Sequence, residues 1–211
     1  MVLRQLVYFT VKNVVFNDDT QFTYEAFGSG SYDNAPEYST DINNVFLPIN
    51  EAISRLSDLE KIPYKVVEVN KASIDSNNVL SLSNTGVKEV ISLAQVYAGG
   101  YKALKFKPLS YVGIQKILIL DDVDQSMPLY LEYKEDIPFF TSAHMSVELA
   151  GFGITSSMCN YIIEYASAKL SEDRSADLSN MHVTRAEQYF ANINQVKSAF
   201  PQKQIEVKYG I

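Results

Sequence analysis

The sequence predicts an α+β protein with helices toward both ends of the chain and a central antiparallel β module of hairpins. Apolar residues recur every three or four positions near both ends, which is the helical period. Between residues 64 and 134 they alternate and are interrupted by turn residues, which is the strand period. We therefore expect a single domain of 211 residues. Its parts are a helical segment and loop (1–62), a β module (63–140), a helical hairpin (154–200) and an extended C-terminal arm (201–211).

The N-terminal segment contains two predicted helices separated by a loop. Apolar residues at Leu3, Leu6, Val7 and Val11 have helical spacing, although β-branched valines leave a strand open. Residues 28–40 are rich in Gly, Ser, Asn, Asp and Pro and predict an irregular loop, either a plain connector or a docking loop for a neighbouring subunit.

A clearer helix is predicted over about residues 44–60. Asp41 or Asn43 can cap its start, Pro48 fits its first turn, and Pro63 ends it.

The β module is predicted to hold short strands and two hairpins. Residues 64–70 and 79–82 read as strands. A hairpin pairs 87–97 with 101–107 across Gly99-Gly100, and a second pairs 114–120 with 129–134 across an acidic loop, 121–126. A long loop then runs from Pro138 to Gly153.

Two helices, 154–170 and about 177–200, are expected to pack antiparallel because a short polar turn joins them. The second carries an apolar stripe that includes Met181, Ala186, Tyr189 and Phe190, and Pro201 stops it. The arm that follows has a strand pattern with no partner nearby in the sequence. It either joins the protein's own sheet or adds to another chain. The predicted interface residues are Ile205, Val207, Tyr209 and Ile211.

Composition and charge exclude several classes of protein. A net charge of −7 argues against a protein whose main task is to grip nucleic-acid phosphates. One cysteine, Cys159, rules out an intramolecular disulfide, and a cysteine-based zinc site is not expected. Arg4, Lys12 and Asn13 interrupt the apolar N-terminus, so neither a signal peptide nor a membrane span is expected. The chain is expected in the cytosol when made.

No catalytic constellation emerges from the nucleophiles and histidines. His144 lies in the loop TSAHMSVE without a nucleophile-elbow pattern and reads as a surface histidine. His182, near the start of the last helix, reads as solvated or helix-packing, and Cys159 reads as a small buried hydrophobe.

Metal, phosphate and nucleic-acid motifs fail as well. The acidic loop does not fit a calcium site, because Met127 and Tyr133 occupy positions where glycine and glutamate are required. Neither glycine pair has the context of a phosphate-binding loop. Lys102, Lys105 and Lys107, interleaved with Tyr101 and Phe106, could bind a nucleic-acid single strand, but with a net charge of −7 an amphipathic surface strand is the preferred interpretation. We therefore predict no catalytic, metal-binding or cofactor-binding residues and no cofactor.

The order of these elements resembles the head–tail adaptor, or connector, proteins of tailed bacteriophages, and most closely the ring proteins of crAss-like short-tailed phages. Three short phrases carry the resemblance, together with the order of elements along nearly the whole chain. They fall on Ile49, Asn50 and Ala52, on Tyr165, Ala166, Ala168 and Leu170, and on Ala186 and Tyr189.

The resemblance implies a structural virion protein at the head–tail junction and not an enzyme. Its subunits would form a homo-oligomeric ring, a dodecamer, beneath the portal protein and above the tail or further ring proteins. Double-stranded DNA would pass through the channel without specific binding, which suits an acidic wall. Two alternatives remain: a virion or surface β module that binds a glycan or a host protein, and a hydrolase that uses His144.

Overall fold

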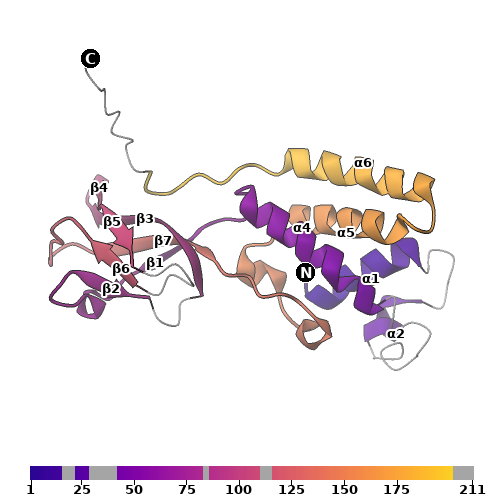
Figure 1. Cartoon of the computed structure of the whole chain (residues 1–211), viewed down its shortest axis with the longest axis horizontal. Helices are drawn as coiled ribbons and strands as arrows, with labels where there is room; N and C mark the ends of the chain where they lie inside the picture. The colour runs from indigo at the N-terminus through magenta and orange to yellow at the C-terminus, as the bar shows by residue number, and fades with distance from the viewer. Residues whose placement is uncertain (16–21, 29–41, 83–85, 110–115, 202–211) are drawn as a thin grey trace, which may run out of the picture. The chain divides into compact units, whose positions relative to one another are not determined.

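The structure is a computed structural model that describes residues 1–15, 22–28, 42–82, 86–109 and 116–201 (Figure 1). It confirms the α+β class, with N-terminal helices, a central β module and C-terminal helices. The helices are α1 (Leu3–Val14), α2 (Tyr24–Gly28), α4 (Phe46–Asp58), α5 (Ser156–Ser171) and α6 (Ala176–Asn192). The strands are β1 (Lys65–Glu68), β2 (Val79–Ser81), β3 (Val87–Tyr97), β4 (Gly100–Ala103), β5 (Phe106–Pro108), β6 (Lys116–Ile119) and β7 (Leu129–Glu135).

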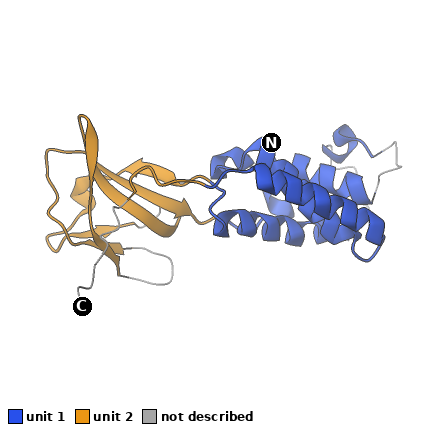
Figure 2. Ribbon diagram, turned by 90° about the horizontal axis from the view of Figure 1, so that it is seen from above, with its two compact units in different colours: residues 1–62, 138–195 blue, residues 63–137, 196–211 orange. Residues whose placement is uncertain are grey.

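The chain forms two compact units, which Figure 2 colours separately. A helical unit comprises residues 1–62 and 138–195, and a β unit comprises residues 63–137 and the chain from Val196 onward. The helical unit contains the predicted helical segment, residues 154–195 of the predicted hairpin and the last three residues of the predicted β module. The β unit contains residues 63–137 of that module together with the end of the predicted hairpin, from Val196 onward.

In the helical unit, α5 packs against α1, α4 and α6. The predicted N-terminal helix is confirmed as α1, and its spaced apolar residues are completely buried; these are Leu3, Leu6, Val7 and Val11. The predicted helical hairpin is confirmed as well, because α5 and α6 lie side by side (Figure 1). A helix packed on three neighbours buries most of its circumference, which explains why the apolar residues of α5 spread beyond one stripe.

Helix α4 confirms the helix predicted over 44–60, with a different start. Val45 occupies its N-cap position, where we predicted Asp41 or Asn43. Pro48 falls in the first turn, where its missing N–H costs no helical hydrogen bond. The amide of Asn50 then clamps the helix to a distant segment: its Oδ1 accepts from the Phe140 N–H (2.7 Å) and its Nδ2 donates to the Phe140 carbonyl (2.9 Å).

The predicted loop from Pro138 to Gly153 contains two short 3₁₀ helices, Ser142–His144 and Leu149–Phe152. The same segment holds the start of α1, because the Leu3 N–H donates to the Val147 carbonyl at 2.9 Å. It is therefore an ordered part of the helical unit.

The β unit is built from two antiparallel sheets. One has four strands in the order β1-β7-β3-β4, and the other has three in the order β2-β6-β5. Paired Leu93 and Leu131 lie on the inner face of the four-stranded sheet, and their side chains join a core with Leu80, Leu104 and Ile117. Because side chains alternate along a strand, the neighbouring pair Ser92 and Glu132 lies on the opposite face of that sheet.

Two strand pairings were predicted wrongly. The strand expected over 101–107 is divided between β4, which pairs with β3 across a turn with Gly99 at φ +95°, and β5, which belongs to the other sheet. The chain changes sheet at Leu104, which is fully buried between the two strands. The expected hairpin of 114–120 with 129–134 is also wrong, since β6 pairs with β2 and β5 and β7 pairs with β1 and β3.

The last helix ends eight positions earlier than predicted, at Asn192 and not at Phe200. Ile193 already has an extended backbone (φ −85°, ψ 116°), and its carbonyl accepts a hydrogen bond from Lys61. The predicted stripe is wrong in part, because Met181 and Tyr189 are each 38% exposed, whereas Ala186 is buried. Ser179 and His182 are the other buried residues of α6.

None of the helices in the described part of the chain is long and apolar enough to span a bilayer.

Candidate functional site

The predicted interface residues Ile205, Val207, Tyr209 and Ile211 lie outside the described residues. The structure does describe the segment that leads to them, residues 196–201, which we call the strap. The strap lies on the outer face of the four-stranded sheet, where it contacts the side chains of β4 and β7. We take the strap as the candidate interaction site, because the predicted C-terminal arm begins where the strap ends.

The first anchor of the strap is the carboxylate of Glu132, a central-strand residue that is only 2% exposed. Its Oε1 accepts from the backbone N–H of Ala199 at 2.7 Å. Its Oε2 accepts from the hydroxyls of Ser92, at 2.6 Å, and Ser198. Three donors therefore compensate the desolvation of a buried carboxylate, and two of them belong to the strap.

The second anchor is aromatic. The ring of Phe200 lies 5.4 Å from that of Tyr101 in an edge-to-face arrangement and 6.2 Å from that of Tyr130. The Tyr101 hydroxyl donates to the carbonyl of Pro201 at 3.1 Å. Aromatic pairs of this kind contribute about 0.5–1.5 kcal/mol each beyond their buried area. The strap is thus held over its last four residues, 198–201, and its last described residue lies beside β4.

The β1 strand forms the far edge of the same sheet among the described residues. Its two valines, Val66 and Val67, are 46% and 41% exposed. Lys65 is held by Glu135 on the neighbouring strand at 2.6 Å. An edge strand with exposed apolar side chains offers backbone groups and surface to an added strand.

Acidic and basic residues near the hairpins have structural roles. The Asp121 carboxylate accepts from the Lys105 N–H (2.7 Å), at the point where the chain passes from β4 to β5. Hydrogen bonds from Ser126 lower the pKa of Asp124. The backbone of Asp124 pairs with the side chain of Gln95, which is fully buried. The acidic loop is therefore anchored to β3 at its centre.

Lys102, Lys105 and Lys107 do not lie on one continuous strand, contrary to our interpretation. They fall in β4, in the connection that follows it, and in β5.

His144 is engaged locally. Its Nδ1 accepts from the Thr141 N–H at 3.1 Å and lies 3.0 Å from the Thr141 hydroxyl, which closes a 3₁₀ turn. Its ring packs edge-to-face on Phe140 at 5.9 Å. The structure thus places His144 in a capping role.

His182 is buried in the helix-packing role that we gave as one of two alternatives. It is 2% exposed, and its Nδ1 lies 2.6 Å from a carboxylate oxygen of Glu164 on α5. Its Nε2 is buried without a hydrogen-bond partner among the described residues. Cys159 is 1% exposed, and burial raises the pKa of its thiol, which disfavours the reactive thiolate.

Sequence reasoning missed Glu132 and the strap. Residues 129–134 were predicted only as one strand of a hairpin, and residues 193–200 were predicted as helix. The available signal was the serine at position 92 and the aromatic residues at 101, 130 and 200, but only the strand pairing brings them together.

Among the described residues, no three His, Cys, Asp or Glu side chains are grouped so that they could hold a metal ion. Comparison of the chain with known family models and with curated proteins finds no match.

Proposed function

We propose that this protein is a structural virion subunit that forms a ring at the portal vertex, joins the phage head to the tail and extends the DNA channel. It would act without catalysis or a cofactor. Its partners are other copies of itself in a dodecamer, the portal protein and the tail or further ring proteins. DNA would slide past a subunit of net charge −7 without specific binding.

The observation that carries the proposal is the strap. A subunit that grips a neighbour with an extended arm needs a rigid point from which the arm departs, because a freely moving base adds an entropic cost to every contact. The buried Glu132 carboxylate and the Phe200 ring supply such a base for the arm residues 202–211. The strand pattern of the arm and the exposed β1 edge are consistent with pairing between chains.

The test is negative-stain imaging of the purified protein, alone and mixed with the portal protein from the same genome. Twelvefold rings, or added density beneath the portal, are the expected results. Assembly that occurs only in the presence of the portal also supports the proposal, since the portal can act as the template for the ring. A monomer that ignores the portal would overturn it.

Two variants separate the arm from the fold. Deleting residues 202–211 should weaken ring formation while the circular dichroism and unfolding midpoint stay unchanged. His144→Ala should leave assembly intact, because the contacts of His144 are local, to Thr141 and Phe140. If the deletion left ring formation unchanged, the arm would not be the contact.

The glycan-binding alternative is favoured by one observation, the exposed aromatic side chain of Tyr97 (48%) at the end of β3. It predicts a protein that stays monomeric with the portal and binds a carbohydrate array, with binding lost in Tyr97→Ala.

A further inference from the structure

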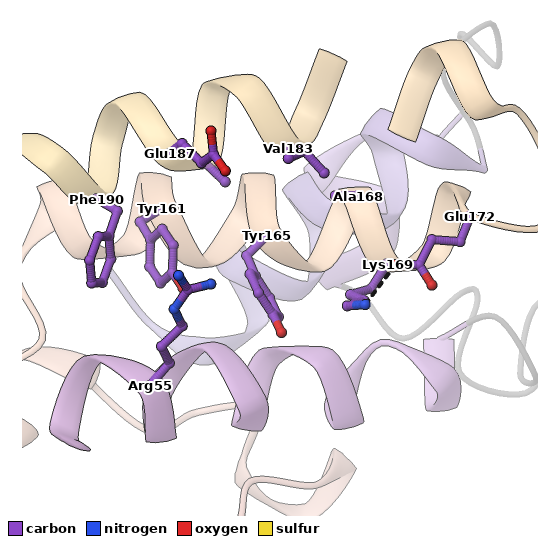
Figure 3. Close-up of a pocket in the computed structure, with 10 residues that line it drawn as sticks. Arg55, Tyr161, Tyr165, Ala168, Lys169, Glu172, Val183, Glu187 and Phe190 are labelled. Atoms are coloured by element: carbon purple, nitrogen blue, oxygen red, sulfur yellow. Dashed lines mark hydrogen bonds and ion pairs between the residues drawn. The ribbon is translucent and has the colours of Figure 1, made fainter. Parts of the chain in front are cut away.

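The helical unit contains a groove of about 320 Å³ between α4, α5 and α6 (Figure 3). Its lining is unusual for a bundle surface, because aromatic rings and charged side chains alternate along it. The residues that the argument uses are Arg55, Tyr161, Tyr165, Glu187 and Phe190. The strap and the β unit do not contribute to this lining.

One end of the groove concentrates positive charge over an aromatic ring. The guanidinium carbon of Arg55 lies 5.1 Å from the centroid of the Phe190 ring, and Lys61 Nζ lies 5.0 Å from the same centroid. Lys61 donates to the carbonyl of Ile193, whereas Arg55 has no carboxylate partner among the described residues. An exposed arginine that stacks on a ring can still donate hydrogen bonds from its guanidinium group to a carboxylate.

A second donor lies beside this arginine. Tyr161 is 1% exposed, and its buried hydroxyl lies close to the Arg55 side chain without a hydrogen bond of standard geometry among the described residues. Burial raises the pKa of Tyr161, and the nearby positive charge of Arg55 offsets part of the rise, so the hydroxyl is protonated at neutral pH. Figure 3 shows the Arg55 side chain reaching from α4 toward Tyr161. A ligand oxygen at this end would satisfy both groups.

The rest of the lining favours a ring next to that oxygen. Tyr161 and Phe190 pack with centroids 5.1 Å apart, and Tyr165 continues the aromatic wall at 5.8 Å from Tyr161. Glu187 lines the same groove and can accept from a hydroxyl. The ligand that matches is a peptide in which a carboxylate side chain adjoins a tyrosine.

We propose that this groove binds residues 29–41 of a second copy of the chain. That segment, SGSYDNAPEYSTD, has three carboxylates, no lysine or arginine, and two tyrosines that each adjoin an acidic residue, as Tyr32-Asp33 and Glu37-Tyr38. Its carboxylates complement Arg55 and its rings complement the aromatic wall, whereas the other basic residue of the lining, Lys169, already pairs with Glu172. The inference rests on the proposed function, because it names one contact between neighbouring subunits of the ring.

The geometry of such a contact fits a ring. The segment 29–41 of one copy and the groove of the next belong to different parts of the chain, so the contact is heterologous. Heterologous contacts close into rings when the rotation between copies permits, whereas a two-fold dimer needs one patch that matches itself.

The binding test uses a synthetic peptide of residues 29–41 and the full chain at concentrations where it is monomeric, measured by fluorescence anisotropy. Arg55→Glu should weaken binding at least roughly tenfold, because the peptide carboxylate then meets a like charge. Arg185→Glu is the matched control, since Arg185 is also an exposed arginine of this unit but does not line the groove. Equal loss in the two variants, or no binding to the unmodified protein, would overturn the proposal.

The association test combines a groove variant with a loop variant. Arg55→Glu keeps the loop, and the double variant Asp33→Lys with Glu37→Lys keeps the groove. Each alone should lose self-association, and their mixture should form a complex that stops at one copy of each, seen by analytical ultracentrifugation. No mixed complex would overturn the proposal, as would a peptide that binds the loop variant but not the unmodified monomer, because the groove would then hold the chain's own loop.

Different results would overturn the groove contact and the adaptor function. Rings that form normally with Arg55→Glu would overturn the groove contact and leave the adaptor function standing. An unmodified protein that forms no rings, alone or on the portal, would overturn the adaptor function, while peptide binding that depends on Arg55 would still support the groove.

Discussion

Two buried side chains, Glu132 in the β unit and His182 in the helical unit, are satisfied to different degrees, although Glu135 of the β unit also has a buried oxygen without a hydrogen-bond partner among the described residues. In the β unit, the buried Glu132 carboxylate receives three hydrogen bonds and holds the strap. In the helical unit, the equally buried His182 has one partner, Glu164, and its second ring nitrogen has none among the described residues. The hydroxyls of Tyr161 and Ser167 are likewise buried without partners there.

This difference shows that buried polar side chains can have two different effects in a protein interior. A fully satisfied buried group fixes one arrangement of the chain, because each of its partners would lose a hydrogen bond by moving. A partly satisfied group lowers stability and leaves bonding capacity for a ligand. We therefore expect substitutions in the β unit to damage stability most and the helical unit to tolerate some losses.

Glu132→Ala should have the largest effect, about 3 kcal/mol of unfolding free energy, because it removes three charge-assisted hydrogen bonds and leaves the Ser92 hydroxyl buried beside a cavity. Urea denaturation measures the loss, and amide hydrogen exchange at Ala199 reports release of the strap. Glu89→Ala is the control, since Glu89 is 54% exposed and pairs only at the surface with Lys134. A cost no greater than the control's, about 0.5 kcal/mol, would show that the strap is not anchored at Glu132.

His182→Ala comes next, with an expected loss of about 2 kcal/mol, because it strands the Glu164 carboxylate, whose side chain is only 12% exposed. Thermal and urea unfolding at neutral pH measure it, with His144→Ala as the control on a partly exposed histidine. A gain in stability would mean that the half-satisfied imidazole costs more than its bond to Glu164 supplies.

Tyr161→Phe should change stability by less than about 1 kcal/mol at pH 7, in the stabilising direction, because it removes a buried hydroxyl without a partner. The raised pKa of Tyr161 adds a pH dependence above its ordinary value of 10.0. The unfolded chain ionises there first, so the contribution of Tyr161 is complete below pH 10 and is lost as pH rises through the folded value. Urea unfolding between pH 7 and 11 should show a smaller loss in the variant, and identical profiles would contradict burial of the hydroxyl.

The Lys169–Glu172 pair should contribute least. Lys169 Nζ lies 2.6 Å from Glu172 Oε1, but the side chains are 43% and 53% exposed. Fixing two exposed side chains costs conformational entropy, which offsets most of the attraction between the charges. A double-mutant cycle with Lys169→Ala and Glu172→Ala should give a coupling below about 0.5 kcal/mol that shrinks further in high salt. A coupling above 1 kcal/mol would show that the groove screens this pair from water.

The periodicity of apolar residues was sufficient to predict many of the helices and strands. The helices α1, α4 and α5 follow from apolar residues three and four positions apart, and β1, β2 and β3 follow from alternation and turn residues. Each pattern depends on the period of a single element, which nearby residues alone set. The acidic character of the chain followed from composition alone, as the net charge of −7.

Strand pairing and the site depended on contacts between distant residues. Residues 129–134 pair with β1 and β3 and not with the nearer β6, because the inner-face pair Leu93 and Leu131 completes the core. Buried polar positions are equally hard to foresee: Glu132 resembles any solvent-facing strand residue until the strap covers it.

The α+β class and most helices could thus be predicted from the sequence, since short-range sterics and hydrophobic spacing decide them, and the net charge follows from composition alone. The end of α6 at Asn192, the strap on Glu132 and the groove around Arg55 came only from the folded chain. The physical reason is that the strap depends on a hydrogen bond across 67 positions, from the Ala199 N–H to the buried Glu132 carboxylate, and no pattern of neighbouring residues encodes that contact.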